Sequence, residues 1–356
     1  MEALDWNSLA NRYDRERMAT VLERFPTQCQ EAVRMGERFE FIWNGSIDKV
    51  VVCGMGGSAM AGEVARRFGS VPMFVNRSYT LPVFVDRATL LVAVSYSGNT
   101  VETLTAFKQG LEKDVPLFCI TSGGRMEEMA KSHEIPLLKI PPGYQPRMAL
   151  GYISLPLLTV LAHLGLVKGL GSWEALIAAL VQIRAKCKPA VPRDENPAGE
   201  LASALNGRIP SIYGTVDNTD FVAMRWKTQI NENAKQLAFW NVIPELDHNE
   251  ISTLVKTDLT RDLLIILLRN GYDRVENLDR IDTMKELLAE DSIPYQEVTA
   301  EGEGALSQIF SQVYFGDYAT FYLALLNQID PTPVFLIERF KRALAERSSR
   351  TGEQPL

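Results

Sequence analysis

Two short segments combine glycine with aliphatic hydroxyls in a pattern that suits an anion. Gly54–Ala59 follows the apolar run Val50–Val52 and precedes a helix-like segment, which indicates a glycine loop between a strand and a helix. Ser95–Thr100 repeats this arrangement further along the chain. Such loops expose backbone N–H groups, and the helix dipole favours negative charge at a helix N-terminus. With four hydroxyls, counting Ser58, the two loops predict a pocket for a phosphate monoester.

A dinucleotide site is the alternative for the first loop. Gly54–Ala59 satisfies the Gly-x-Gly-x-x-Gly/Ala pattern. Dinucleotide-binding folds also place an acidic residue at the end of the second strand, and the strand predicted at Pro72–Arg77 contains none. Arg77 could serve a 2′-phosphate instead, so the nicotinamide interpretation stays open, as does a simple tight turn.

A second polar cluster lies in the C-terminal half of the chain. Glu232 stands between Asn231 and Asn233, two poor helix formers within a segment predicted to be helical over 220–238. Contact with a ligand is one explanation for the asparagines, and a solvated helix face is the alternative for Glu232. His248 lies in a loop between acidic residues and an asparagine, which suits a proton carrier.

Short apolar runs alternate with helical patterns and predict the elements that position these loops. The runs of the first alternation are Val50–Val52, Met73–Val75, Leu90–Val94, Leu117–Ile120 and Leu137–Ile140. Those of the second are Ile209–Gly214, Leu263–Arg269 and Tyr295–Val298, with helices predicted over 220–238, 275–289 and 304–328. Alternation of this kind predicts an α/β fold, with parallel sheets flanked by helices.

The predicted organisation has two α/β domains joined by helices. The first covers residues 1–165 and includes a helical segment over 1–47, and a helical connection covers 166–205. The second domain covers 206–330, and 331–356 forms a C-terminal helix and tail.

Composition narrows the classes of function. The net charge of −7 disfavours a nucleic-acid partner, because such proteins usually carry a strong basic patch. The longest apolar stretch, about Leu150 to Leu166, is too short and interrupted to span a membrane, and the N-terminus does not look like a signal peptide. Four cysteines without a Cys-x-x-Cys pair suit a reducing cytoplasm, and we find no metal-ligand spacing.

Taken together, four motifs resemble those of the bifunctional phosphoglucose/phosphomannose isomerases, a branch of the sugar-isomerase (SIS) superfamily. They are Gly54–Ala59, Ser95–Thr103, Asn231–Lys235 and Pro244–Glu250. The resemblance covers nearly the whole chain. It implies two SIS-type domains, each an α-β-α sandwich, and a homodimer with shared active sites.

The resemblance also implies roles for individual residues. The phosphate-binding loops correspond to Gly56, Gly57, Ser58, Ser95, Ser97 and Thr100. Glu232 corresponds to the base that moves a proton between C1 and C2, and His248 to a ring-opening residue supplied by the partner subunit. Arg147 corresponds to the arginine that stabilises the enediolate, and Lys341 to a lysine that assists ring opening.

The implied activity is isomerisation of glucose 6-phosphate, and of mannose 6-phosphate as a second aldose, to fructose 6-phosphate without a cofactor or a metal. This chemistry needs an acid and a base for ring opening, a base beside the carbon that loses its proton, and positive charge near the oxyanion. A sugar-phosphate sensor without turnover is the alternative. Such a sensor would need the loops but not Glu232 and His248.

Overall fold

The computed structural model describes residues 5–258 and 260–351, which form two compact units. The first-sheet unit comprises Thr27–Gly169 together with the chain from Val334. The second-sheet unit comprises the chain up to Pro26 together with Leu170–Pro333. The units therefore do not follow sequence order, because the described residues up to Pro26 belong with the second sheet and the C-terminal helix with the first.

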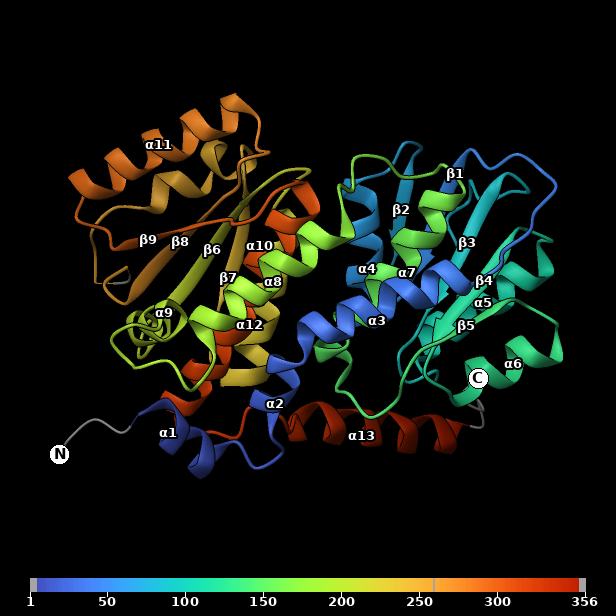
Figure 1. Ribbon diagram of the computed structural model, residues 1–356, viewed down its shortest axis with the longest axis horizontal. Coiled ribbons are helices and arrows are strands. Elements are labelled where there is room, and N and C mark those ends of the chain that lie inside the picture. The colour runs from blue at the N-terminus through green and yellow to red at the C-terminus, as the bar shows by residue number, and fades with distance from the viewer. Residues whose placement is uncertain (1–4, 259, 352–356) are drawn as a thin grey trace. The chain divides into compact units, whose positions relative to one another are not determined.

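The first-sheet unit contains five parallel strands in the order β2-β1-β3-β4-β5 (Figure 1). Their bounds are β1 Lys49–Cys53, β2 Met73–Asn76, β3 Thr89–Val94, β4 Leu117–Thr121 and β5 Leu137–Lys139. β-Branched and other apolar residues suit strands that are buried on both faces. The direction of winding reverses between β1 and β3, and open α/β sheets bind their ligands at such a switch point, beyond the carboxyl ends of the strands.

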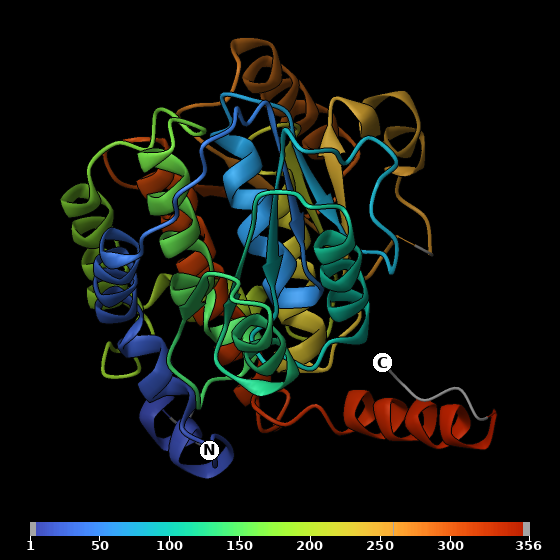
Figure 2. The same ribbon diagram turned by 90° about the vertical axis from the view of Figure 1, so that its right-hand side faces the viewer.

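Helices cover both faces of this sheet, as predicted for an α-β-α sandwich (Figures 1 and 2). Their bounds are α3 Phe25–Arg38, α4 Gly56–Arg67, α5 Val101–Glu112, α6 Gly124–Ser132 and α7 Leu150–His163, with a 3-10 turn η1 at Pro146–Met148. Helix α13 Phe335–Thr351 belongs to the same unit, but its side chains from Phe335 to Leu344 are exposed. A Cβ atom at Gly62 of α4 would meet Val52, whereas one at Gly110 of α5 would meet Leu91. Since side chains alternate between the faces of a sheet, α4 and α5 lie on opposite sides.

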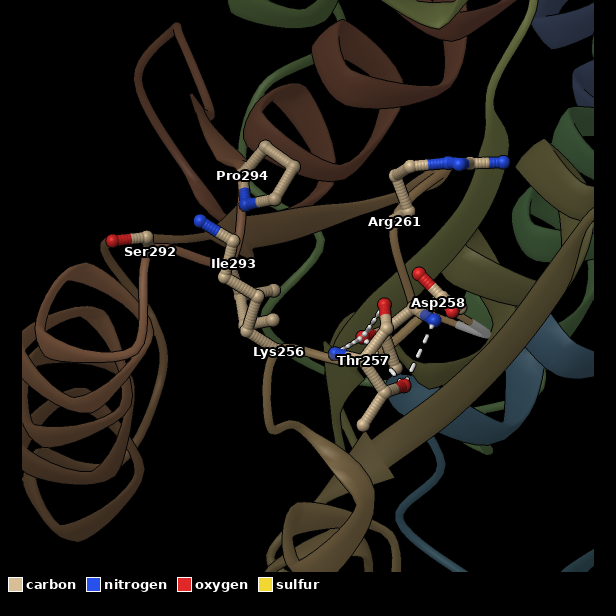
Figure 3. A pocket seen from close by; sticks show the side chains of 8 residues that line it. Lys256, Thr257, Asp258, Arg261, Ser292, Ile293 and Pro294 are labelled. Carbon is tan, nitrogen blue, oxygen red and sulfur yellow. Dashed lines mark hydrogen bonds between the residues drawn. The ribbon is translucent and has the colours of Figure 1, made fainter.

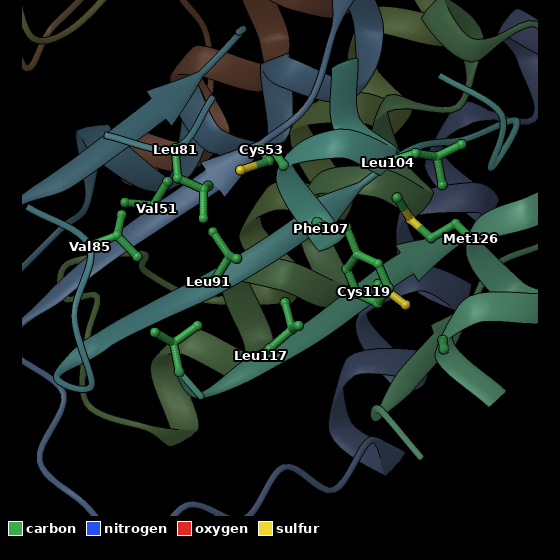
Figure 4. Close-up of a cluster of buried hydrophobic side chains, with 14 residues drawn as sticks. Val51, Cys53, Leu81, Val85, Leu91, Leu104, Phe107, Leu117, Cys119 and Met126 are labelled. Atoms are coloured by element: carbon green, nitrogen blue, oxygen red, sulfur yellow. The ribbon is translucent and has the colours of Figure 1, made fainter. Parts of the chain in front are cut away.

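One core cluster of the first-sheet unit lies between the strands, α5 and α6 (Figure 4). Val51, Leu91 and Leu117 point to this face from three adjacent strands, and Phe107 and Met126 contribute from the two helices. The five side chains are all buried. This packing holds the carboxyl ends of β1, β3 and β4, from which the loops of the candidate site emerge.

The second-sheet unit contains four parallel strands in the order β7-β6-β8-β9. The strands are β6 Ile209–Thr215, β7 Phe239–Ile243, β8 Leu263–Arg269 and β9 Tyr295–Thr299. The helices are α1 Trp6–Tyr13, α2 Met18–Glu23, α8 Trp173–Cys187, α9 Pro197–Leu205, α10 Asp220–Gln229, α11 Val275–Glu290 and α12 Ala305–Leu326. In both sheets the second strand in the chain lies at one edge, next to the first, and the third strand lies on the other side of the first. A second switch point therefore lies between β6 and β8.

The long helix α12 is the centre of the second-sheet unit. Helices α8 and α9, which come from the predicted connection, pack on it. The N-terminal segment packs on it too: the ring of Trp6 lies 4.3 Å from that of Tyr322, and the ring of Phe25 lies 6.3 Å from that of Phe310. Trp6 is fully buried. The N-terminal helices are thus part of a core built mainly from the C-terminal half of the chain.

Two sequence predictions about local structure were wrong. The helix predicted over 220–238 ends at Gln229 and continues as a π-helical turn η2 at Ile230–Ala234, and the apolar run that follows forms strand β7. The helical segment predicted over 1–47 ends at Arg38. Beyond it, the rings of Phe39 and Phe41 pack against Phe118 at 5.5 and 5.2 Å, so the chain leaves the helix to cover β4.

Candidate active site

The loops after β1 and β3 meet at the switch point of the first sheet. The first leads through Met55 into α4, and the second leads through Thr100 into α5. Neither cap residue makes a side-chain capping hydrogen bond. The first N–H groups of a helix lack partners within the helix, and with the positive end of the helix dipole they attract an anion. Two helix N-termini thus begin at one switch point.

Hydroxyl groups join the two loops. The Oγ atom of Ser58 accepts a hydrogen bond from the backbone N–H of Tyr96 at 3.1 Å, and the Oγ atom of Ser95 donates to the Oγ1 atom of Thr100 at 3.1 Å. Ser58 and Ser95 are buried, whereas Ser97 is exposed and its Oγ atom accepts from the N–H of Asn99 at 3.3 Å. The structure therefore brings Ser58, Ser95 and Thr100 into one polar region, with Ser97 at its surface.

The glycine loop leaves room and allows a close backbone approach. Gly56 has a φ of +50°, and no atom lies within 4 Å of the position that its Cβ would take. A Cβ atom at Gly57 would lie 3.0 Å from the carbonyl oxygen of Pro146 and 3.1 Å from the nitrogen of Arg147. Gly57 thus lets the backbone of η1 rest on the first turn of α4. The structure brings Arg147, which is only 4% exposed, next to the predicted phosphate loops.

A third loop supports the second one and was missed in the sequence. Gly98 has a φ of +68°, and a Cβ atom there would lie 1.8 Å from the carbonyl oxygen of Gly123. A Cβ atom at Gly124 would lie 2.4 Å from the carbonyl oxygen of Ser97. The Oδ1 atom of Asn99 also accepts from the N–H of Arg125 at 3.1 Å. The paired glycines directly after the apolar run of β4 were the available signal for this loop.

Tyr96 connects the hydroxyl loops to the segment that leads to Arg147. Its phenol donates to the carbonyl oxygen of Pro141 at 2.9 Å and accepts from the N–H of Tyr144 at 2.8 Å. Burial raises the pKa of Tyr96 above its ordinary value, which keeps the phenol protonated and able to donate. Tyr96 therefore holds the loop before η1 from the side of β3.

Glu232 lies in the π-helical turn of the second-sheet unit, and its two asparagine neighbours hold that turn. Asn233 is fully buried and its Nδ2 atom donates to the Oγ1 atom of Thr320 at 3.0 Å. The Nδ2 atom of Asn231 donates to the carbonyl oxygen of Gln236 at 2.8 Å. The amides thus fix the backbone around a partly exposed glutamate, which is a structural explanation for the asparagines. Single π-turns in helices are frequent at functional sites.

Lys235 ties this turn to the end of α12. It has a φ of +52°, which stops the helix. Its Nζ atom donates to the carbonyl oxygens of Asn233, Asp330 and Pro331 at 3.2, 3.0 and 3.2 Å. The lysine of the Asn-Glu-Asn-x-Lys motif therefore has a structural contact that the sequence did not reveal.

A buried ion pair anchors the helix that leads to Glu232. Arg225 on α10 donates from Nη2 to both carboxylate oxygens of Asp317 on α12, at 2.9 and 2.8 Å, and both side chains are less than 5% exposed. The Nε2 atom of Gln229 donates to the same carboxylate at 2.8 Å. Removing one partner of a buried pair is usually far more destabilising than replacing the pair as a whole. This pair therefore fixes α10 against α12 next to the turn.

Glu232 and His248 adjoin opposite ends of β7 in one chain. Glu232 precedes β7, while His248 ends a 3-10 turn, η3 Glu245–His248, that follows it. At about 3.3 Å per residue, the five residues of β7 alone separate the two ends of the strand by about 13 Å. His248 is exposed, and Lys341 is exposed on α13 of the first-sheet unit.

The loop that carries His248 is anchored by its acidic neighbours. The carboxylate of Glu250 accepts from the phenol of Tyr213 at 2.6 Å and from the amide of Asn241 at 2.5 Å. Asp247 pairs with Arg280 at 2.8 Å. These contacts tie the loop to β6, β7 and α11 and leave the imidazole between them at the surface.

The switch point of the second sheet has a different content. The carboxylate of Asp273 accepts from the hydroxyl of Thr215, from the Nδ2 atom of Asn218 at 2.6 Å and from the N–H of Asn270 at 2.8 Å. A Cβ atom at Gly214 would lie 2.4 Å from the carbonyl oxygen of Thr219, so the turn after β6 closes tightly. The carboxylate of Asp273 therefore occupies hydrogen-bond donors that a bound anion would need.

Other features of the described residues lie away from these groups. Within residues 5–258 and 260–351, no three histidine, cysteine or acidic side chains gather closely enough to hold a metal ion. In the same part of the chain, no helix has the length and apolar character needed to cross a membrane. A cavity of about 380 Å³ before β8 and β9 is lined by Lys256, Arg261 and Pro294, among others, and by none of the predicted site residues (Figure 3).

Comparison with known proteins identifies the family of this chain. The family model for the bacterial phospho-glucose isomerase C-terminal SIS domain matches residues 194–344. The bifunctional phosphoglucose/phosphomannose isomerase of Caldicellulosiruptor bescii is 40% identical over 90% of this chain and 97% of that protein. The chain belongs to this family. The bifunctional phosphoglucose/phosphomannose isomerase of Thermoplasma acidophilum is 35% identical over 85% of this chain and 91% of its own length.

Solved structures share the fold of this isomerase. A hypothetical protein from Thermus thermophilus has a TM-score of 0.74 at 16% identity, over 96% of this chain and 93% of that one. The predicted α/β class and the resemblance to the bifunctional isomerases are thereby confirmed.

Proposed function

We propose that this isomerase interconverts glucose 6-phosphate with fructose 6-phosphate, and mannose 6-phosphate with the same ketose. The observation that carries the proposal is the pair of hydroxyl-bearing loops, joined by the bond between Ser58 and Tyr96, at the start of α4 and α5. The open space at Gly56 and the neighbouring buried Arg147 suit a phosphorylated, anionic substrate. Membership of the family supports these three sugar phosphates as substrates.

The residues divide the chemistry among them. The phosphate is held by the loops that carry Ser58, Ser95, Ser97 and Thr100. His248, with Lys341, moves the protons that open the ring. Glu232 takes the proton from C2 of the aldose and delivers it to C1, so that its carboxylate is regenerated, while the hydroxyl proton of O2 passes to O1 and leaves the ketose carbonyl at C2.

Arg147 stabilises the oxyanion of the enediolate that forms between the two proton transfers. A cation held next to a developing oxyanion lowers the barrier most when the surrounding protein has already fixed it in place. Arg147 is almost fully buried, and its backbone rests on Gly57, which suits such a role.

The proposed enzyme is a homodimer in which Glu232 of one chain acts with His248 of the other. The support for this arrangement is that the two residues lie beyond opposite ends of β7 in a single chain. A two-fold axis presents the same surface of each chain to its partner, so each site would take one residue from each subunit.

The shared site predicts complementation between two inactive variants. Glu232→Gln and His248→Ala should each be inactive as pure dimers. With random two-fold pairing, half of the dimers are mixed, and in each of these one site carries both substitutions and the other carries neither. A co-refolded mixture should therefore recover roughly a quarter of wild-type activity. An inactive mixture whose heterodimers are verified by mass spectrometry would rule out the shared site.

The substrate proposal is tested by a coupled assay with both aldose phosphates on the purified protein treated with EDTA. We expect both to be converted to fructose 6-phosphate and the activity to survive chelation. Tight binding of either sugar without turnover would instead support a sensor. Activity lost in EDTA and restored by zinc would contradict the proposed metal-independent mechanism.

We also propose a cytoplasmic location. Burial raises the pKa of the thiols of Cys53, Cys119 and Cys187 to about 12, and all four cysteines are free. Buried, protonated thiols without disulfides suit a reducing compartment.

A further inference from the structure

Gln28 on α3 binds the backbone of the residues that directly follow Arg147 in the chain. Its Nε2 atom donates to the carbonyl oxygen of Met148 at 3.0 Å, and its Oε1 atom accepts from the N–H of Gly151 at 2.9 Å. The side chain is only 1% exposed. The nitrogen and the oxygen of one buried amide therefore each make a hydrogen bond to the four-residue segment Met148–Gly151, which begins directly after Arg147.

The N-terminus of α7 explains why an amide is needed there. The cap residue Ala149 provides no side-chain hydrogen bond, so the first N–H groups of α7 need partners from elsewhere. Gln28 supplies an acceptor to Gly151. A Cβ atom at Gly151 would lie 2.8 Å from the Oε1 atom of Gln28, so glycine at this position leaves the space that the amide occupies.

A second contact from the same helix secures the residue that follows this segment. Glu31 lies three residues after Gln28, on the same face of α3, and its carboxylate accepts from the phenol of Tyr152. On the other side of Arg147, the backbone rests on Gly57. The residues adjoining Arg147 are thus fixed on both sides, which limits where its guanidinium can point.

We propose that Gln28 is a positioning residue for Arg147 and sets the rate of enediolate formation without touching the substrate. This inference rests on the role proposed above for Arg147. Displacing a catalytic group by about 1 Å can cost about 10²-fold in rate, so a hydrogen-bonded clamp next to Arg147 is of catalytic value. The phosphate loops make no use of the Gln28 amide, so substrate affinity is independent of it.

The test replaces Gln28 by Met, which keeps the length of the side chain and removes both hydrogen bonds. With glucose 6-phosphate as substrate, we expect kcat to fall by about 10- to 100-fold with KM changed by less than about threefold. Arg147→Gln should lower kcat by about 10²–10³-fold. Adding Gln28→Met to Arg147→Gln should lower kcat no further, because Gln28 acts through the arginine.

Gln312→Met is the matched control. Gln312 on α12 is also 1% exposed, and its Nε2 atom donates to the carbonyl oxygens of Arg269 and Val298 at 3.1 and 3.0 Å. This variant should lose stability as Gln28→Met does and keep a wild-type kcat in the folded protein. An equal loss of kcat in Gln28→Met and Gln312→Met would show that Gln28 acts only through the stability of the protein, and would overturn the proposal.

Gln28→Glu provides a second route if the methionine variant does not fold. Burial raises the pKa of a carboxyl group, and the protonated acid can donate to Met148 and accept from Gly151. Relative to wild type, its kcat should therefore recover as the pH is lowered through that raised pKa.

Two results would overturn the proposal for Gln28 alone: a folded Gln28→Met enzyme with a wild-type kcat, or effects of Gln28→Met and Arg147→Gln on kcat that multiply. An Arg147→Gln enzyme with a wild-type kcat would overturn the role proposed for Arg147 as well. This variant therefore distinguishes a failure of the Gln28 proposal alone from a failure of the proposed role of Arg147.

Discussion

The two sheets have the same relative strand order, but their switch points carry opposite chemistry. Between β1 and β3 the loops present hydroxyls, a glycine with open space beside it and two helix N-termini. Between β6 and β8 the carboxylate of Asp273 accepts hydrogen bonds from Thr215, Asn218 and Asn270. The first switch point suits an anion, whereas the second already contains one of its own.

The two switch points share one topology and differ in the polar groups that their loops present. A carboxylate repels a phosphate and also occupies the donors that would bind it. In the second-sheet unit, the proposed base Glu232 lies instead beyond the start of β7, in a turn held by buried asparagine and lysine contacts. We therefore expect substitutions in that turn to affect kcat and substitutions in the first switch point to affect KM.

The largest expected effect is that of Glu232→Gln. The substitution keeps the shape of the side chain and removes the group that carries the proton, so kcat should fall by about 10²–10⁴-fold or more. Calorimetric titration with fructose 6-phosphate should give an affinity close to that of the wild type. A near-normal kcat would show that the base lies elsewhere. It would also contradict the expected assignment of kcat effects to the turn of the second-sheet unit and of KM effects to the first switch point.

Substitutions of the loop hydroxyls should have the next largest effect, and on KM. Thr100→Val and Ser97→Ala each remove one of the proposed hydrogen bonds to the charged phosphate, a kind of bond worth about 1.5–3 kcal/mol. Steady-state kinetics should therefore show KM raised by about 10- to 100-fold, with a much smaller change in kcat.

Thermal unfolding is the control for these loop variants. Loop hydroxyls contribute little to the core, so the melting temperature of Ser97→Ala should stay near that of the wild type. An unchanged KM in both variants would mean that these hydroxyls do not hold the phosphate.

The smallest expected effect on the reaction is that of Asp273→Asn. Loss of the bond from the N–H of Asn270 should cost about 1–3 kcal/mol of unfolding free energy, seen as a Tm lowered by roughly 2–10 °C. KM and kcat for glucose 6-phosphate should not change. A raised KM for the sugar phosphate would show that the second switch point takes part in binding after all.

Local signals in the sequence were sufficient to predict the first sheet and the loops after β1 and β3. Apolar runs, a glycine loop and clustered hydroxyls all lie within a few residues of one another, and the structure places Ser58, Ser95 and Thr100 together. The helix predicted over 220–238 extends beyond the observed end of α10, and strand β7, which begins directly after residue 238, was not predicted; the αL backbone of Lys235 ends the helical segment. That conformation depends on carbonyl groups of Asp330 and Pro331, far along the chain.

Contacts between distant residues account for the rest. No local pattern indicates that Gln28 binds the backbone at Met148 and Gly151, or that the glycine pair at 123–124 supports Gly98. The division into compact units was equally hidden, because it depends on the packing of Trp6 against Tyr322. The proposed pairing of Glu232 with His248 involves a second chain and came from the family resemblance.

The interrupted second-sheet unit has a consequence for synthesis on the ribosome. Trp6 emerges about 300 residues before Tyr322, a delay of roughly 15–60 s at about 5–20 residues per second. The strands of the first sheet all lie within Thr27–Gly169 and can pair during that interval. Trp6 and Phe25 cannot complete their packing until α12 has been made, so the core of the second-sheet unit closes only after the first sheet is available to fold.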